Sequence, residues 1–170
     1  MIYILIMILR ILKPHLEAQN KADIQPSKIV SSSFFPQKNE KTTVAGHWEG
    51  TITRDEGGGK RTTFAMELDV VQKDKNVTGL SYVSYEDGAK KYAAQMDVKG
   101  KVNGTYFKYL ETKIVKADSI PDNEWCIKKA DLIFRIQNDK PTLEGIWEGT
   151  TNVGKCTPGR IFLQKRPPRV

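Results

Sequence analysis

The chain has 170 residues, of which 39% are hydrophobic and 28% are charged, with a formal net charge of +7. This composition is ordinary for a soluble globular protein, and the length fits one domain plus a tail. The basic residues are spread along the chain with acidic residues between them, which favours a solvated cationic surface and makes a nucleic-acid partner unlikely.

The first nine residues, 1–9, form an unbroken apolar run that is too short to span a bilayer but has the length of a signal-peptide core. Residues 16–18, Leu-Glu-Ala, make a tolerable cleavage site. No positive charge precedes the run, so a non-cleaved anchor or an amphipathic helix is the alternative. We predict a signal-like leader over 1–18 and export to the periplasm, the cell envelope or the medium, with no transmembrane span in the mature chain.

Residues 19–44 are rich in Lys, Gln, Ser and Asn without a sustained period, which is typical of a disordered linker. The structured domain is predicted over 45–166, followed by a short tail over 167–170. The two cysteines of this domain, Cys126 and Cys156, are either free core thiols or one disulfide. Export favours the disulfide, which would stabilise the fold by roughly 3–4 kcal/mol.

From residue 45 onward, apolar and polar residues alternate in short runs, and no stretch shows a helical period over ten residues. The pairs Asp87-Gly88 and Asn103-Gly104 are strong hairpin signals because such turns need residues that accept positive φ. The predicted strands are 46–54, 61–72, 77–85, 91–101, 105–115, 125–137, 142–150 and 157–165.

Mostly short loops join these eight strands, so neighbours in the sequence should pair antiparallel. Closing the sheet removes its two exposed edges, and eight strands enclose room for side chains or one small ligand. The predicted fold is therefore all-β, a single eight-stranded antiparallel up-and-down barrel preceded by an apolar leader and a flexible linker.

One six-residue pattern occurs twice, as GHWEGT at 46–51 and GIWEGT at 145–150. In a closed meander these two strands run in the same direction, one strand apart. Gly46 and Gly145 would then leave space for the large indoles of Trp48 and Trp147. We predict that both indoles fill the barrel near one end.

These residues resemble the calycins, the lipocalin and avidin barrels. The resemblance rests on Gly46-His47-Trp48 opening the first of eight meander strands, and on residues 76–82, NVTGLSY, which are similar to an avidin pattern. It implies a barrel able to hold a small ligand. It also implies that a basic residue near the last strand, Arg160 or Arg166, lies over the first Trp.

Catalytic groups are scarce in the predicted domain. His47 is its single histidine, so a three-histidine zinc site is excluded and no Cys/His cluster has ligand spacing. We expect His47 at the surface or rim of the barrel. We therefore expect no enzyme activity, no metal and no cofactor.

The candidate ligand-binding residues lie on strands and at the barrel mouth. In one register Phe107, Tyr109 and Glu111 point inward, where a carboxylate and a phenol could orient a polar ligand group. In the other register, which we favour, Glu111 pairs with a Lys or Arg on the outer surface. Trp125, beside the longest loop, either guards the barrel mouth or packs on the disulfide, and Tyr92 shares an apolar strand face.

Two functions follow from this sequence. The first is an exported, non-catalytic, lipocalin-like barrel that binds a small, partly hydrophobic molecule. The alternative is an envelope or extracellular module that binds protein or glycan and has a solidly packed core. A cavity of several hundred Å³ inside the barrel would favour the first, and a filled interior the second.

Overall fold

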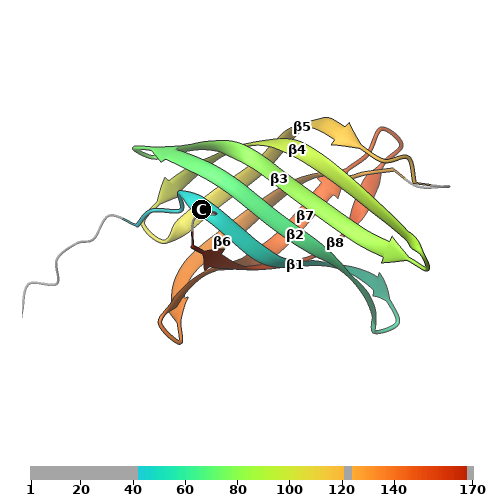
Figure 1. Cartoon of the computed structure of the whole chain (residues 1–170), viewed down its shortest axis with the longest axis horizontal. Coiled ribbons are helices and arrows are strands. Elements are labelled where there is room, and N and C mark those ends of the chain that lie inside the picture. The colour runs from blue at the N-terminus through green and yellow to red at the C-terminus, as the bar shows by residue number, and fades with distance from the viewer. Residues whose placement is uncertain (1–41, 121–123, 168–170) are drawn as a thin grey trace, which may run out of the picture. The chain divides into compact units, whose positions relative to one another are not determined.

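A computed structural model describes residues 42–120 and 124–167, so the predicted leader, most of the linker and most of the tail lie outside the described residues. All regular structure in the described part is β (Figure 1). The strands are β1 (Gly46–Gly57), β2 (Lys60–Lys73), β3 (Asn76–Asp87), β4 (Lys90–Asn103), β5 (Tyr106–Ala117), β6 (Ile127–Gln137), β7 (Lys140–Thr150) and β8 (Lys155–Arg166).

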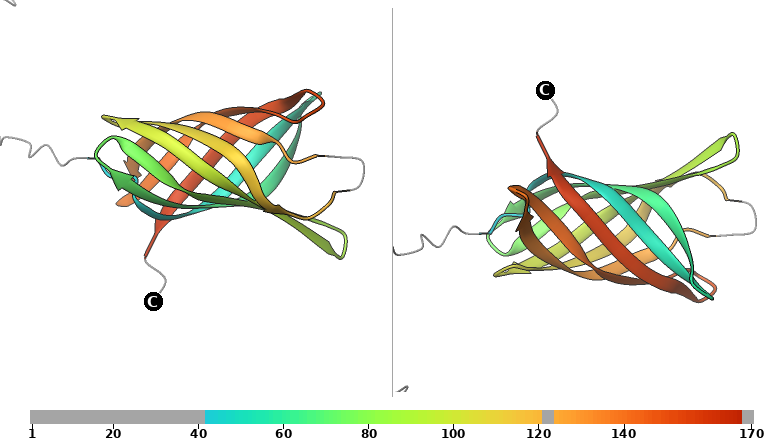
Figure 2. Two further views of the ribbon diagram at one scale, coloured as in Figure 1. Left: turned by 90° about the horizontal axis from the view of Figure 1, so that it is seen from above. Right: turned by 90° about the horizontal axis from the view of Figure 1, so that it is seen from below.

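Each strand pairs antiparallel with its neighbours in the sequence, and β1 pairs with β8, so the sheet closes into a barrel (Figure 2). At the closure Gly50 lies opposite Leu163. The two predicted glycine turns have φ angles of 59° at Gly88 and 60° at Gly104. The predicted all-β meander barrel is confirmed.

Inward-pointing side chains fill the barrel. On β1, for example, Trp48 and Ile52 are 0% and 1% exposed, while Thr51 between them faces solvent. The largest fully buried side chains come from seven of the eight strands, which is the packing expected of a small closed barrel. They are Trp48, Tyr109, Phe107, Ile52, Met66, Leu68, Met96, Leu132, Leu143, Ile161, Leu163 and Glu111.

The two tryptophans of the repeated pattern are buried as predicted, but they lie at different levels of the barrel. The indole of Trp48 donates to the carbonyl of Val44, before β1 begins, at 2.8 Å, and that of Trp147 donates to the carbonyl of Thr53 at 2.7 Å. Along β8 their partner residues are six positions apart, 165 against 159, or about 20 Å. The prediction that both fill one end is therefore wrong.

Two glycines of the repeat permit close approach of neighbouring strands. A Cβ added at Gly50 would lie 2.1 Å from the carbonyl oxygen of Phe162, and one at Gly145 would lie 2.0 Å from that of Asp131. Neither distance is tolerable, so glycine at these positions lets the barrel coil tightly around the indoles.

A basic side chain does lie over Trp48, but it belongs to Lys165, whose Nζ is 5.5 Å from the ring centroid. The prediction of Arg160 or Arg166 is wrong because side chains alternate along β8. Lys165 shares the inward phase of Ile161 and Leu163 and lies directly opposite Trp48. Arg166 points outward instead, where its Nε donates to Glu49 at 2.9 Å.

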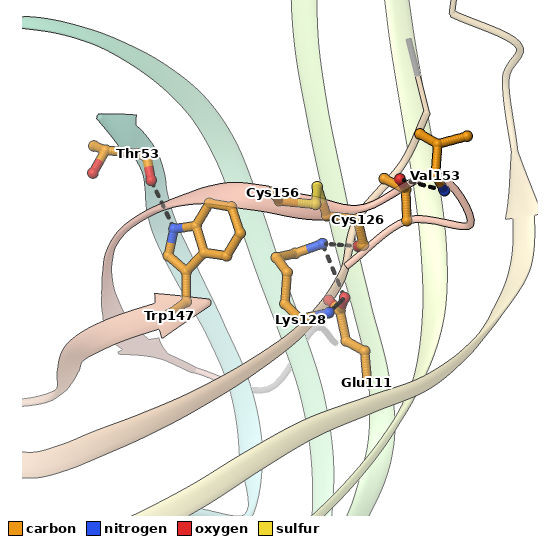
Figure 3. The surroundings of a disulfide bond; sticks show 8 residues. Thr53, Glu111, Cys126, Lys128, Trp147, Val153 and Cys156 are labelled. Atoms are coloured by element: carbon orange, nitrogen blue, oxygen red, sulfur yellow. Dashed lines mark hydrogen bonds and ion pairs between the residues drawn. A yellow bond between two sulfur atoms is a disulfide. The ribbon is translucent and has the colours of Figure 1, made fainter. Parts of the chain in front are cut away.

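The predicted disulfide is confirmed. Cys126, just before β6, is bonded to Cys156 in β8, at a sequence separation of 30 (Figure 3). In the chain-entropy model a loop of this length contributes about 3.6 kcal/mol. The bond fixes the start of β6 at the end of the barrel that carries Trp147.

Candidate functional site

The inner side of β5 carries the first part of the site. Phe107, Tyr109 and Glu111 are 1%, 2% and 1% exposed. In contrast, Tyr106, which precedes them, and Leu110, which lies between Tyr109 and Glu111, are 61% and 46% exposed. The favoured prediction, with Glu111 on the outer surface, is therefore wrong, and the inward register is the one adopted. Glu111 does pair with a lysine, but that lysine also points inward.

The carboxylate of Glu111 accepts four hydrogen bonds inside the barrel. One oxygen accepts from the hydroxyl of Ser81 at 2.8 Å and from that of Tyr109 at 2.5 Å. The other accepts from the backbone N–H and from the ammonium of Lys128, each at 2.9 Å. All four partners donate, which suits an ionised carboxylate that only accepts.

Burial is nearly complete around this pair, since the side chains of Lys128 and Glu111 are 4% and 0% exposed. Burial raises the pKa of Tyr109 well above its ordinary value, and the neighbouring charge of Glu111 raises it further. The phenol therefore stays protonated and remains a donor. The network places one compensated pair of charges in an otherwise apolar core.

Lys128 lies between Glu111 and the backbone of Cys126 (Figure 3). Its ammonium also donates to the carbonyl of Cys126 at 2.9 Å. An ammonium has three donors, so two are used by Glu111 and Cys126 within the described residues. Lys128 lines a pocket of about 130 Å³ at the disulfide end of the barrel. The other lining residues are Ile52, Arg54, Thr62, Phe64, Val83, Tyr85, Ile120, Glu124, Trp125, Cys126 and Trp147.

Aromatic rings form a contiguous wall of this mouth pocket. Tyr85 packs edge-on against Phe64 and Trp125, with centroid distances of 5.4 and 6.2 Å, and stacks on Tyr92 at 5.3 Å. The guanidinium of Arg54 lies 5.8 Å from the Phe64 ring centroid. Desolvation, followed by the proximity of Tyr92, raises the pKa of Tyr85, so its hydroxyl remains a donor.

The predicted ligand-binding residues separate into two groups. Trp125 lines the mouth pocket and is held there by a 2.8 Å hydrogen bond from its indole to the carbonyl of Asp118, and Tyr92 supports the pocket through Tyr85. Glu111 lies one hydrogen bond below the pocket. The ring of Phe107 packs edge-on against Tyr109, 6.3 Å away, deeper in the core.

Sequence reasoning missed Lys128, Phe64, Tyr85 and Arg54 as site residues. The sequence did contain a signal for Lys128. Lys128 has the same alternation phase as Ala130 and Leu132, which the pattern already placed inward.

His47 lies on the outer side of β1, as expected, but its side chain is buried. Nδ1 is 2.6 Å from Asp69 and Nε2 is 2.9 Å from Glu49. Since carboxylates only accept, both contacts are hydrogen bonds when both ring nitrogens carry a proton. The hydrogen bond from His47, with a further contribution from Arg166, lowers the pKa of Glu49.

Within residues 42–120 and 124–167, no group of three or more His, Cys, Asp and Glu side chains is placed to hold a metal ion. The same part of the chain contains no helix with the length and hydropathy to cross a membrane.

A scan against protein-family models finds no match for this chain, and a search of curated proteins finds no relative.

Proposed function

We propose that the chain is an exported, non-catalytic, calycin-like barrel whose mouth pocket binds a small, partly hydrophobic group. The observation that carries this proposal is an aromatic wall in a pocket whose lining also includes the buried side chain of Lys128. Binding sites for small molecules commonly combine apolar walls with a few polar groups that fix orientation.

The size of the pocket limits the ligand. About 130 Å³ is below the range of roughly 300–1,000 Å³ that accommodates a whole drug-sized molecule. The ligand would therefore insert one ring, or one end of a longer molecule, between Phe64, Tyr85 and Trp125.

The charges around the pocket favour an uncharged ligand group. Lys128 is compensated by Glu111, and Arg54 donates to Glu56 at 2.7 Å. Neither cation therefore offers a strong net attraction to an anion. A planar ring with a hydrogen-bond acceptor, such as a phenol or an aryl ketone, would stack on the aromatic wall and accept the third N–H of Lys128.

Export is supported by the disulfide, because such bonds persist in oxidising compartments and are rare in the cytosol of mesophiles. The predicted signal-like leader, 1–18, lies outside the described residues and remains a prediction.

Two measurements test the proposal. Native mass spectrometry of protein purified from its own host should reveal a retained small molecule. Titration with 4-methylphenol, followed by tryptophan fluorescence, should show saturable binding that Trp125→Ala weakens strongly. Tyr106→Ala is the matched control, since that ring is 61% exposed on the outer side of β5. Equal loss in both variants, or no binding of any ring compound, would refute the mouth pocket.

The packed interior favours the alternative, a module that binds protein or glycan through its surface. Trp48, Phe107 and Leu132 are among the side chains that fill the space where a lipocalin-like chamber would lie. A folded, disulfide-bonded protein that retains no small molecule and binds none would support this alternative.

A further inference from the structure

Strands β5 and β6 pair along only part of their length, so the sheet is open between them at one end of the barrel. These strands pair only from Tyr106↔Ile133 to Leu110↔Lys129, although β5 continues to Ala117 along its β4 side. Within the described residues, no strand pairs with the β6-facing edge of β5 beyond Leu110. All six residues from Thr112 to Ala117 are exposed. Among residues 42–120 and 124–167, no strand occupies the backbone groups on this edge, so it has the form that accepts an added strand.

The division is built into the structure. The register between β4 and β5 shifts twice, at Gln95/Met96 and at Asp97/Val98, and such bulges bend a strand away from its neighbour. At the point of divergence the backbone N–H of Lys128 donates to the carboxylate of Glu111 instead of to a backbone carbonyl of β5. The buried side chain of Glu111 therefore replaces a backbone acceptor at the point where β5 and β6 stop pairing.

A groove of about 540 Å³ lies between the two diverging strands. It is lined by Ile114 and Ala117 of β5 and, on the other side, by Ile127 and residues 150–152. The described part of the connection between β5 and β6 also lines it, with Asp118, Ser119, Ile120, Glu124 and Trp125. The carboxylate of Asp118 accepts a hydrogen bond from the backbone N–H of Ala93 at 2.8 Å. The apolar side chains of Ile114 and Val115 are 41% and 47% exposed. Exposed apolar side chains beside an unpaired strand edge are the two elements of a β-augmentation site.

We infer that this edge, Thr112–Ala117, binds an extended acidic segment of another protein by strand addition. The charge of the edge selects the partner. Lys116 has no ion pair within the described residues, and Lys113 has only an exposed contact with Asp97 at 3.6 Å. Acidic side chains opposite these lysines would add complementarity and fix the register.

A second copy of the chain is a poor occupant for the same reason. Antiparallel self-pairing that places Ile114 opposite Val115 also places Lys113 opposite Lys116, since both pairs of residue numbers sum to 229. Like charges directly opposite one another destabilise a strand pair, and edge lysines are a common guard against self-association. This inference does not depend on ligand binding in the mouth pocket, although Ile120, Glu124 and Trp125 line both the pocket and the groove.

The test uses the ¹⁵N-labelled full chain with its disulfide intact. The probe is a capped peptide of about eight residues with alternating valine and glutamate, and the control peptide alternates valine and lysine. The glutamate peptide should shift and protect from exchange the amides of Thr112–Ala117, and should bind about tenfold more tightly than the lysine peptide. The double variant Lys113→Glu/Lys116→Glu, with both side chains exposed, should reverse this preference.

Four outcomes would overturn the inference. They are the absence of shifts at millimolar peptide, equal binding of both peptides, shifts confined to other strands, and a concentration-dependent dimer that pairs through β5. Thermal unfolding of the double variant should match that of the parent, which shows that the barrel remains intact.

Discussion

The buried pair of Glu111 and Lys128 leads to a quantitative prediction about stability. Glu111→Leu removes the acceptor of four hydrogen bonds and leaves the Lys128 ammonium with only the Cys126 carbonyl. Removing one member of a fully buried ion pair typically costs about 3–5 kcal/mol. For a barrel of this size we expect the melting temperature to fall by roughly 10–20 °C.

Lys128→Met should cost less than Glu111→Leu. It leaves the carboxylate with three of its four donors, the hydroxyls of Ser81 and Tyr109 and the backbone N–H. The double variant should cost less than the sum of the single variants, with a coupling on the order of 2 kcal/mol, because neither charge is then left unpaired. Guanidinium unfolding of the oxidised protein, followed by near-ultraviolet circular dichroism, measures all three free energies.

Lys129 provides a matched control on the same strand. It pairs with Glu148 at the same 2.9 Å distance, but both side chains are about two-thirds exposed, at 64% and 66%. Solvent screening makes such pairs contribute little, so Lys129→Met should leave the free energy of unfolding nearly unchanged. Similar unfolding midpoints for Lys128→Met and Lys129→Met, or strict additivity in the double variant, would refute the reasoning.

Three further predictions concern closure, the disulfide and pH. Reducing the disulfide should lower the free energy of unfolding by about 3.6 kcal/mol, and coincident urea curves with and without a phosphine reductant would contradict this. Gly50→Ala should prevent normal closure, since the added Cβ would lie 2.1 Å from a carbonyl oxygen of β8. Gly58→Ala is the control, because its added Cβ would have no atom within 4 Å. It should cost only about 1–2 kcal/mol, from the positive φ at this position. Equal soluble yields of Gly50→Ala and Gly58→Ala would contradict this prediction. The hydrogen bond from His47 lowers the pKa of Glu49 in the folded protein. Ionised Glu49 therefore stabilises the folded state at pH values above its unfolded-state pKa. This stabilisation is lost as the pH falls through its folded-state pKa. The difference in melting temperature between wild type and Glu49→Gln should therefore shrink as the pH falls below about 5, and parallel curves would refute it.

The strands and their order were predictable because side chains alternate along a half-buried strand and because two turns carry a glycine that accepts positive φ. The observed strands extend one to three residues beyond the predicted ends at most boundaries, since hairpin ladders continue to the turn itself. Strand β2, for example, runs from Lys60 to Lys73. The strand predicted to start at Trp125 begins instead at Ile127, because Trp125 is held by the preceding loop.

The candidate site was less predictable because it depends on two charged residues pointing inward. Glu111 has the phase of Phe107 and Tyr109, and Lys128 has the phase of Ala130, so alternation alone would have placed both inside. A one-residue register slip reverses that placement, and the outward register was favoured for this reason. Two opposite charges with inward phase on adjacent strands would have favoured the inward register, because each compensates the other. The bulges that turn β5 away from β6 leave no comparable pattern in the sequence.

The repeated Gly-x-Trp-Glu-Gly-Thr pattern serves different purposes in its two copies. In the first, the close approach is at the glycine after the tryptophan, Gly50, whose added Cβ would lie 2.1 Å from a β8 carbonyl. In the second it is at the glycine before the tryptophan, Gly145, at 2.0 Å from a β6 carbonyl. The equivalent positions, Gly46 and Gly149, meet their nearest neighbours at 3.0 and 2.8 Å. A duplicated half-barrel would place the tightest contact at the same motif position twice. The repeat is instead explained by two strands, β1 and β7, that each coil around an indole at a different level of the barrel. No duplication is needed.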